Sequence, residues 1–453
     1  MSDNKESQVL NKSLDGGVKN DSQIKQKDDK PNKIKKSVSI ILSVILFIIT
    51  FAGGFFTSYL VRGRNANVAS DIVTMMEKVG YIYDPTTGEP RSITEKDVAD
   101  ALVNAILDKY SKYYTAEEYK KVQSTSQGNY DGVGVSFYST EDLEVDQVIL
   151  NSPFDRAGGK VGDLLVSATV DGQETTFTSV NHSLVYFSQI ENGKEFSLKY
   201  QRDGSFYTAV LKKSAYVASY VYYLDDQKEF KFTSDSGAPT GKENSVLNSQ
   251  ITDSTVGYIR ITGFEGGASS QLGSALEFMK TRGKTKLILD LRANGGGYMD
   301  VLCDIASYFI DNGGAKKSAV AISSGKTGNQ IFYTKNNKFC SFIQKACILG
   351  DQDTASASEC LIGAIVHYGD IVDGINNVIV EKNSQGVAKT YGKGIMQTTY
   401  MLVSGGAFKL TTAKILWPDA KTCIHDVGVT PKMGATEAEK GGGINKAIQV
   451  LCS

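Results

Sequence analysis

The sequence predicts an α/β core with a mainly parallel sheet, joined to a smaller α+β domain, a helical N-terminal segment and one transmembrane helix. Three observations support this fold class. From residue 255 onward, apolar strand patterns alternate with helical patterns, as expected for a parallel sheet with helices on its faces. Residues 130–213 instead contain short alternating runs around a single helical pattern. Residues 37–61 contain no charged side chain.

The first 62 residues predict a cytoplasmic tail followed by a membrane anchor. Residues 1–36 hold nine lysines and six acids with few apolar clusters, so we expect them to be disordered. The segment 37–62 is long enough to span a bilayer, and no small-residue cleavage site follows it. Lysines cluster before this span, so the positive-inside rule places the N-terminus in the cytoplasm and the rest of the chain outside.

Residues 63–128 are predicted to be largely helical. Apolar residues recur at spacings of three and four in 70–84 and again in 94–123. Thr94 precedes an acidic first turn, a favourable helix start.

The net charge of −1 over 453 residues shows no basic footprint, so we expect no nucleic-acid partner.

Residues 129–214 predict a small domain of five or six strands and one helix. "DGVGVSF" at 131–137 contains Gly132, Val133, Gly134 and Val135, whose backbone N–H groups can hold a terminal carboxylate. Together with "NSPFDRAGGKVGDLLVSATVDG" at 151–172, this arrangement resembles a PDZ domain of the kind found in proteases. The resemblance implies that Gly132–Val135 bind a peptide. The alternative is that these glycines only begin a strand.

Residues 215–453 predict the α/β core, in which two loops follow buried strands. One is "DLRANGGG" at 290–297 and the other is "TASASE" at 354–359. Loops at the carboxyl ends of parallel strands are where such folds place ligand and catalytic sites. The glycines of the first loop free backbone N–H groups to face a ligand.

Ser356 admits two interpretations. In the S-x-x-E pattern with Glu359 it is a helix N-cap, and at the positive end of a helix it is also a candidate nucleophile. A nucleophilic serine needs a base. His367 lies about three turns along the same helix, His182 is in the other domain and His425 has no supporting context. Lys393, bracketed by glycines, is the alternative base if its pKa is lowered.

"TASASE", "TYGKGIMQ" at 390–397 and "ILDLRANGGG" at 288–297 resemble the carboxy-terminal processing peptidases, or tail-specific proteases. So do "LDKYSKYYTAEEY" at 107–119 and "GGAFKLTTAKILWPDAKTCIHDVGVTP" at 405–431, in the same order along the chain. The resemblance implies Ser356 as nucleophile, Lys393 as general base and Gln397 as the residue that orients the lysine. It places the oxyanion donors on the backbone N–H groups of Gly296 and Ala357.

Three features depart from the family pattern. Gly295 stands where the family usually has proline, which predicts a more flexible oxyanion loop. The chain between Ser356 and Lys393 is longer than in the family, and we expect the excess, 373–389, to project as a hairpin. Gln397 reaches Lys393 if a helix begins near Gly394. Six cysteines are also unusual for the family, and they lack the spacing of metal ligands. Cys340 and Cys347 are the pair nearest in sequence. Cys360 is expected to be buried.

The sequence thus predicts a membrane-anchored, extracytoplasmic serine endopeptidase with a Ser/Lys dyad, recruiting proteins or peptides by accessible C-termini. No metal or other cofactor is expected. A homo-oligomer or an activating partner protein is compatible with the sequence. Two alternatives remain: a catalytically weak or inactive PDZ peptide-binding scaffold, and an active enzyme held latent by its PDZ domain until a partner or substrate displaces it.

Overall fold

The structure, a computed structural model, describes residues 70–80, 82, 87–137, 142–149, 152–225, 229–232, 240–242, 250–315, 317–403, 405–433 and 435–453. The chain divides into two compact units, Met1–Ile93 and Thr94–Ser453. In the first unit, residues 70–79 are helical. The predicted tail and transmembrane segment, 1–36 and 37–62, lie outside the described residues.

The second unit begins with two helices, α2 (Glu95–Ile106) and α3 (Ala116–Ser126), separated by the short strand β1 (Lys112–Tyr114). Thr94 and Thr115 each close a capping box on the acidic residue three positions later. The predicted helical segment is therefore confirmed from Glu95 to Ser126, with one strand inserted between the helices.

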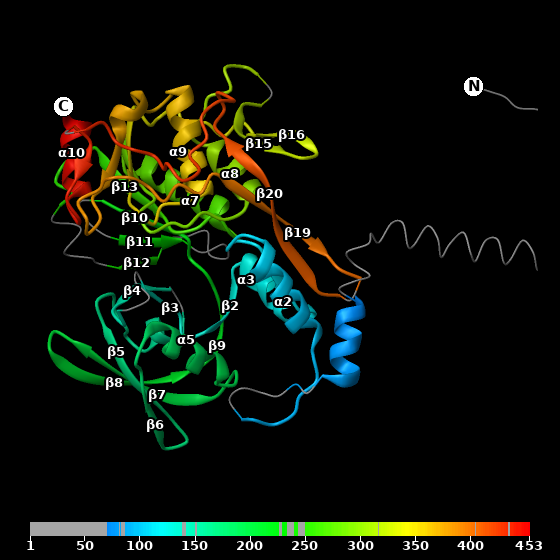
Figure 1. The fold of residues 1–453 in the computed structure, drawn as a ribbon. Helices are drawn as coiled ribbons and strands as arrows, with labels where there is room; N and C mark the ends of the chain where they lie inside the picture. The colour runs from blue at the N-terminus through cyan, green and yellow to red at the C-terminus, as the bar shows by residue number, and fades with distance from the viewer. Residues whose placement is uncertain are drawn as a thin grey trace, which may run out of the picture. The chain divides into compact units, whose positions relative to one another are not determined.

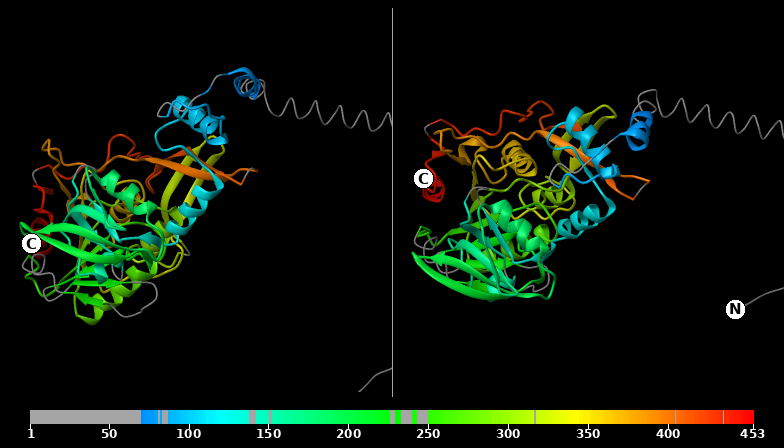
Figure 2. Two further views of the ribbon diagram at one scale, coloured as in Figure 1. Left: turned by 90° about the horizontal axis from the view of Figure 1, so that it is seen from below. Right: turned by 60° about the horizontal axis from the view of Figure 1, so that its bottom comes forward.

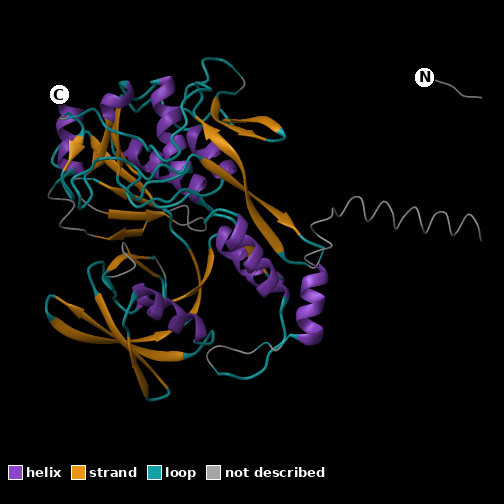
Figure 3. Ribbon diagram, in the orientation of Figure 1, coloured by secondary structure: helices purple, strands orange, loops and turns teal. Residues whose placement is uncertain are grey.

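An α+β layer follows, with its own hydrophobic core around Phe154, Leu165, Phe187, Leu198 and Leu211. Its largest sheet has the strand order β6-β5-β7-β8 and carries a helix, α5 (Val180–Gln189), as Figure 3 shows. The element bounds are β2 (Asn129–Gly132), β3 (Val135–Phe137), β4 (Val145–Val148), α4 (Pro153–Arg156), β5 (Leu164–Val170), β6 (Gln173–Thr176), β7 (Glu195–Arg202), β8 (Ser205–Lys212) and β9 (Ser214–Val217).

The core is built on an eight-stranded sheet of order β12-β11-β10-β13-β14-β17-β18-β21 (Figure 1). The strands from β13 to β21 are parallel, whereas β10, β11 and β12 are antiparallel. The bounds are β10 (Val221–Leu224), β11 (Glu229–Phe232), β12 (Thr240–Lys242), β13 (Val256–Ile261), β14 (Lys286–Asp290), β17 (Lys345–Gly350), β18 (Val378–Glu381) and β21 (Glu437–Ala438).

Both faces of this sheet are buried, which explains its continuous apolar strands. Leu287 and Leu289 of β14 face helices α7 (Ala268–Thr281), α8 (Met299–Ala306) and α9 (Ala357–Tyr368), whereas Ile288 between them faces α10 (Gly443–Cys452). This alternation follows the two-residue period of a strand.

A second sheet, entirely antiparallel, has the order β1-β20-β15-β16, with β19 also paired to β20. Its strands are β15 (Ala319–Gly325), β16 (Gly328–Tyr333), β19 (Ile395–Met401) and β20 (Ala407–Leu416), and β19 and β20 form a long hairpin (Figure 2). The core is therefore mixed and not mainly parallel. Strand β15 does not join the parallel strands: it turns back on β16 and pairs with β20.

Candidate active site

Ser356 lies between strand β17 and helix α9, at the N-cap of that helix. Its backbone is in an unusual conformation for a side chain other than glycine, with φ of 59° and ψ of −115°. Such strain persists only where neighbouring contacts enforce it. The Ser356 N–H donates to the Glu359 carboxylate at 2.8 Å, which fixes this turn. The predicted helix start is thus confirmed, and the N-cap role leaves the side chain partly exposed.

Glu359 joins the Ser356 turn to the segment that carries Lys393. Its fully buried carboxylate accepts hydrogen bonds from the backbone N–H groups of Gly392 at 2.7 Å and Lys393 at 2.9 Å. It also accepts the hydroxyl of Thr390 at 2.6 Å. The longer chain between Ser356 and Lys393 therefore still returns the Lys393 backbone to the Ser356 turn. The predicted hairpin at 373–389 is wrong: most of its first half forms a 3-10 turn (Gly374–Asn377) and the buried strand β18.

The loop after β14 meets the Ser356 turn because β14 and β17 are adjacent parallel strands. Asn294 makes the junction. Its carbonyl accepts from the Ala355 N–H and from the Ser358 hydroxyl, both at 2.9 Å. Its side-chain amide donates to the Ile261 carbonyl at 2.7 Å and accepts from the Gly296 N–H at 2.9 Å.

The predicted oxyanion donors, Gly296 and Ala357, lie against Ser356. A Cβ at Gly296 would come within 2.8 Å of the Ser356 Cβ and 2.9 Å of the Ala357 nitrogen. Among the described residues, the Ala357 N–H has no hydrogen-bond acceptor, as expected in a first helical turn. The Gly296 N–H, in contrast, is directed to the Asn294 side chain. Gly295 is exposed, and a Cβ there would meet nothing within 4 Å.

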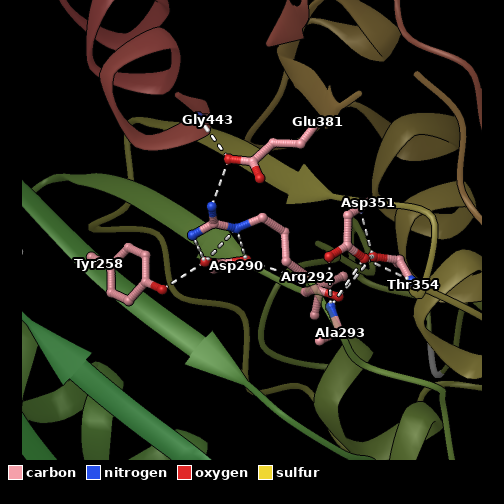
Figure 4. Close-up of polar contacts among 9 residues, drawn as sticks. Tyr258, Asp290, Arg292, Ala293, Asp351, Thr354, Glu381 and Gly443 are labelled. Atoms are coloured by element: carbon pink, nitrogen blue, oxygen red, sulfur yellow. Dashed lines mark hydrogen bonds and ion pairs between the residues drawn. The ribbon is translucent and has the colours of Figure 1, made fainter. Parts of the chain in front are cut away.

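Two buried ionic contacts of Arg292 fix the same loop (Figure 4). Arg292 donates to Asp290 at 3.0 Å and to Glu381 of β18 at 2.7 Å, and Glu381 also accepts the N–H of Gly443 at the start of α10. Burial alone raises the pKa of Asp290, but the adjacent Arg292 guanidinium holds that pKa below its ordinary value. The Asp290–Arg292 pair therefore has a structural role at the base of this loop.

Asp351 fixes the loop on its other side. The Asp351 carboxylate accepts the Ala293 N–H at 3.0 and 3.1 Å, the Asp353 N–H at 3.0 Å and the Thr354 N–H at 3.0 Å. Ala293 has a φ of 55°, a left-handed conformation disfavoured for alanine, so Asp351 stabilises a strained turn. Asp351 thereby ties the loop after β14 to the turn that precedes Ser356.

Lys393 is half-buried in a setting that favours its neutral form. Desolvation lowers the pKa of Lys393, and the positive charge of Lys409 on β20 lowers it further. The Lys393 Nζ lies 4.8 Å from the ring centroid of Tyr110, in the loop between α2 and β1. Among the described residues, no hydrogen bond is formed between Lys393 Nζ and Ser356 or Gln397.

Gln397 is on strand β19, so the predicted helix near Gly394 is wrong. The segment pairs with β20, whose long-range hydrogen bonds outweigh a local helical tendency. The Gln397 side-chain amide donates to the Thr411 hydroxyl at 3.0 Å. Gln397 therefore approaches the site from the hairpin and not from a helix.

A cavity of about 670 Å³ connects the α+β layer with the loop that carries Gly296. On one side it is lined by the predicted peptide-binding residues Gly132, Val133, Gly134 and Val135, and by Leu184 and Phe187 of α5. Ala293, Gly295, Gly296 and Asp353 line it on the other side. Gly134 has a φ of +83°, and a Cβ there would lie 1.9 Å from the Ser152 Cβ, so this turn requires glycine.

Comparison with known proteins shows which proteins the chain is similar to. Residues 255–434 match the profile of peptidase family S41. A probable CtpA-like serine protease of Staphylococcus epidermidis is 26% identical over 89% of this chain and 74% of its own length. A second protein of that description, from Staphylococcus aureus, is 26% identical over 87% of this chain and 71% of its own. The chain is a serine peptidase, and its core is similar to peptidases of family S41.

Among solved structures, the photosystem II D1 C-terminal processing protease covers 80% of this peptidase, and the peptidase covers 88% of it. The sequence identity is 19% and the TM-score is 0.45.

The remaining candidate residues from the sequence are the histidines and the cysteines. The His182 Nδ1 accepts a hydrogen bond from the Thr178 backbone N–H and also pairs with the Thr178 hydroxyl. His367 lies near the end of α9. Within the described part of the chain, all six cysteines are free, no group of residues could hold a metal ion, and no helix is long and apolar enough to cross a membrane. Cys360 is buried, as predicted, and burial raises the pKa of its thiol.

Sequence reasoning missed three residues of the peptidase site. Asn294 lies within the motif at 288–297 and Asp351 lies just before the motif at 354–359. Their short polar side chains, in a Gly-rich loop and after a buried strand, were the available signal. Tyr110 lies 283 positions from Lys393, and nothing in the sequence pairs the two. Glu359 was recognised only as half of a capping box.

Proposed function

We propose that this peptidase cleaves protein chains by a Ser356/Lys393 dyad, with Gln397 as the residue that orients the lysine. The observation that carries the proposal is the Glu359 carboxylate, which holds the N–H groups of Ser356 and Lys393 on one side chain. Because both backbones are fixed by the same buried group, the hydroxyl and the ammonium belong to one site. The lowered pKa of Lys393 supports its role as a base.

In the first half of the reaction, neutral Lys393 takes the Ser356 hydroxyl proton as the oxygen attacks the scissile carbonyl carbon. The tetrahedral oxyanion accepts from the N–H groups of Ala357 and Gly296. On collapse, the Lys393 ammonium gives its proton to the leaving amine, and an acyl-Ser356 ester remains. Water, deprotonated by Lys393, then hydrolyses the ester and restores the serine.

Two groups must reorient for this reaction. The Gly296 N–H must leave the Asn294 side chain to face the oxyanion, and Gln397 must exchange Thr411 for Lys393. We therefore infer that the described arrangement is a resting state whose backbone is in place. Each oxyanion donor contributes roughly 3–4 kcal/mol to transition-state stabilisation in comparable sites.

We propose further that residues 129–214 are a PDZ domain that binds the substrate C-terminus at Gly132–Val135. Among the described strands, β3 pairs only with β4, so its other edge is available to an added peptide strand. The apolar side chains of Leu184 and Phe187 in the cavity suit an apolar C-terminal residue. The same cavity reaches Gly296, which supports delivery of the bound chain toward Ser356.

The localisation proposed is the cell membrane, with the anchor at 37–62, the N-terminus in the cytoplasm and the peptidase outside. The charge distribution before the anchor supports this orientation. A homo-oligomer or an activating partner protein would supply the stimulus that realigns Gly296 and Gln397.

The test is cleavage of an unstructured peptide with a free apolar C-terminus by the full chain in detergent. We expect Ser356→Ala and Lys393→Ala to abolish cleavage and to retain binding of the peptide. Equal cleavage by the wild type and both variants would overturn the dyad. Peptide binding without cleavage by the wild type, even with a partner present, would favour the alternative function of an inactive peptide-binding scaffold.

A further inference from the structure

Tyr110, Tyr391 and Lys109 form a cluster with the Lys393 ammonium. Lys393 Nζ lies 4.8 Å from the Tyr110 ring centroid, and Lys109 Nζ lies 5.1 Å from the same centroid and 5.4 Å from that of Tyr391. The Tyr391 hydroxyl accepts from Lys109 Nζ at 2.8 Å and from the Tyr110 hydroxyl at 3.2 Å. The Tyr110 hydroxyl is therefore held at the ring edge by Tyr391, and the ring has the Nζ of both Lys393 and Lys109 over it.

The loop that carries Tyr110 is fixed to the hairpin that carries Gln397. Asp108 accepts the N–H groups of Tyr110 and Ser111 at 3.0 and 2.9 Å. The buried Ser111 hydroxyl accepts the Thr411 N–H at 3.2 Å, and Thr411 is also the partner of Gln397. Strand β1, which follows the loop, pairs with β20. The second sheet therefore fixes the position of the loop that carries the Tyr110 ring.

We propose that Tyr110 is a positioning residue for Lys393: its ring face holds the protonated Nζ between catalytic steps and sets the pH at which the base is released. The proposal rests on the function of Lys393 proposed above. The attraction between an ammonium and an aromatic face favours the charged form of the lysine. It does not require the ammonium to hydrogen-bond to Ser356. Once Lys393 loses its proton, that attraction ends and the neutral amine is free to approach the serine hydroxyl.

Charges from every neighbouring element act on Lys393 together with this ring. Desolvation and Lys409 of β20 lower the pKa of Lys393, whereas Tyr391, Asp108 and Glu359 raise it. Lys109 is hydrogen-bonded to Tyr391 and lowers the pKa of that phenol. The aromatic face therefore opposes the desolvation of a buried lysine, and it does so without adding a fixed negative charge to the site.

The test is the pH dependence of kcat/KM in the full chain with Tyr110→Phe, Tyr110→Leu and Tyr110→Trp. Phenylalanine keeps the ring and removes only the hydroxyl, so the acidic limb should stay within experimental error of the wild type. Leucine keeps apolar burial but removes the ring, so the limb should move down by about half a pH unit and the plateau should fall by about tenfold. Tryptophan, the strongest aromatic partner of cations, should move the limb up.

Each outcome has a distinct meaning. If Lys393→Ala is inactive but Tyr110→Leu and Tyr110→Trp both leave the acidic limb where it is in the wild type, the role of Tyr110 is refuted and the dyad stands. If Lys393→Ala retains activity, the proposed dyad itself fails. If Tyr110→Leu unfolds, as checked by its thermal transition, the Phe and Trp variants still decide: an unchanged limb in Trp overturns the proposal.

Discussion

At the residue scale, the two adjacent glycines of the oxyanion loop have opposite requirements. Gly295 is exposed, with open space where a side chain would begin, and its backbone does not need a positive φ. Gly296 has a φ of 101° and packs against the Ser356 Cβ. The sequence predicted a more flexible loop from Gly295 and an oxyanion N–H from Gly296. It did not predict that Gly296 packs against Ser356, because that contact comes from a turn far along the chain.

The pair Gly295→Ala and Gly296→Ala tests this difference. Gly295→Ala should keep full activity and raise the free energy of unfolding by about 0.4–1 kcal/mol, since it restricts the unfolded chain without strain. Gly296→Ala should lower kcat by about 10²-fold or more, because it displaces the Ser356 backbone. Chemical denaturation and peptide cleavage measure the two effects. Equal loss of activity in both variants would contradict the assigned geometry.

Lys409 provides a test of the charge around Lys393. Desolvation lowers the pKa of Lys393, and the positive charge of Lys409 lowers it further. Because the proposed base, Lys393, would act in its neutral form, activity should rise as the pH passes upward through the pKa of Lys393. Lys409→Gln removes the repulsion, raises that pKa and should shift the acidic limb of the kcat/KM profile to higher pH. Lys409→Arg keeps the charge and is the control; a shift of the limb to lower pH in Lys409→Gln would contradict the assignment.

At the element scale, the site depends on how two motifs far apart in the chain are joined. The N-cap at Ser356 and the strand-to-helix loops were predictable, because they follow from local turn chemistry and apolar periodicity. The strand at Gln397, the buried strand β18 and the place of β15 in a second sheet were not. These depend on pairing with β20, β17 and β16, and an apolar run does not specify its partner strand.

The Glu359 carboxylate links the Ser356 turn to the segment that carries Lys393. Loss of this carboxylate should separate the two segments. Glu359→Gln replaces an acceptor-only carboxylate with an amide that must turn a donor toward N–H groups. We expect the free energy of unfolding to fall by about 1.5–3 kcal/mol and cleavage to become undetectable. Exposed Glu439, mutated to Gln, should change stability by less than about 0.5 kcal/mol. A Glu359→Gln variant of normal activity and stability would refute the link.

At the scale of the whole molecule, one cavity extends from the proposed peptide-binding loop, Gly132–Val135, to the loop that carries Gly296. Leu184 and Val185 are neighbours on α5, each 46% exposed, but only Leu184 lines the cavity. Sequence predicted Gly132–Val135 as one wall from a loop resemblance, while the facing wall at Ala293–Gly296 required the folded chain.

These two residues form a matched pair for testing recruitment. Leu184→Glu should raise KM about tenfold for a peptide with a free apolar C-terminus, since it places a negative charge beside the bound carboxylate. For the same peptide with an amidated C-terminus, KM should not differ between the variants. Val185→Glu adds the same charge at the same exposure outside the cavity and should leave KM unchanged. An equal rise of KM in both variants would show a general charge effect and not a binding groove.

The central claim, that Ser356 is the nucleophile activated by Lys393, is tested most directly by trapping the acyl-enzyme. The full chain is mixed with an activated ester of a substrate peptide, quenched in acid within one turnover and mapped by mass spectrometry. Acyl transfer onto Ser356 is expected in the wild type, at a rate that falls by about 10²-fold or more in Lys393→Ala, and is expected to be absent in Ser356→Ala. An adduct on a different residue, or the same acylation rate without Lys393, would contradict the claim.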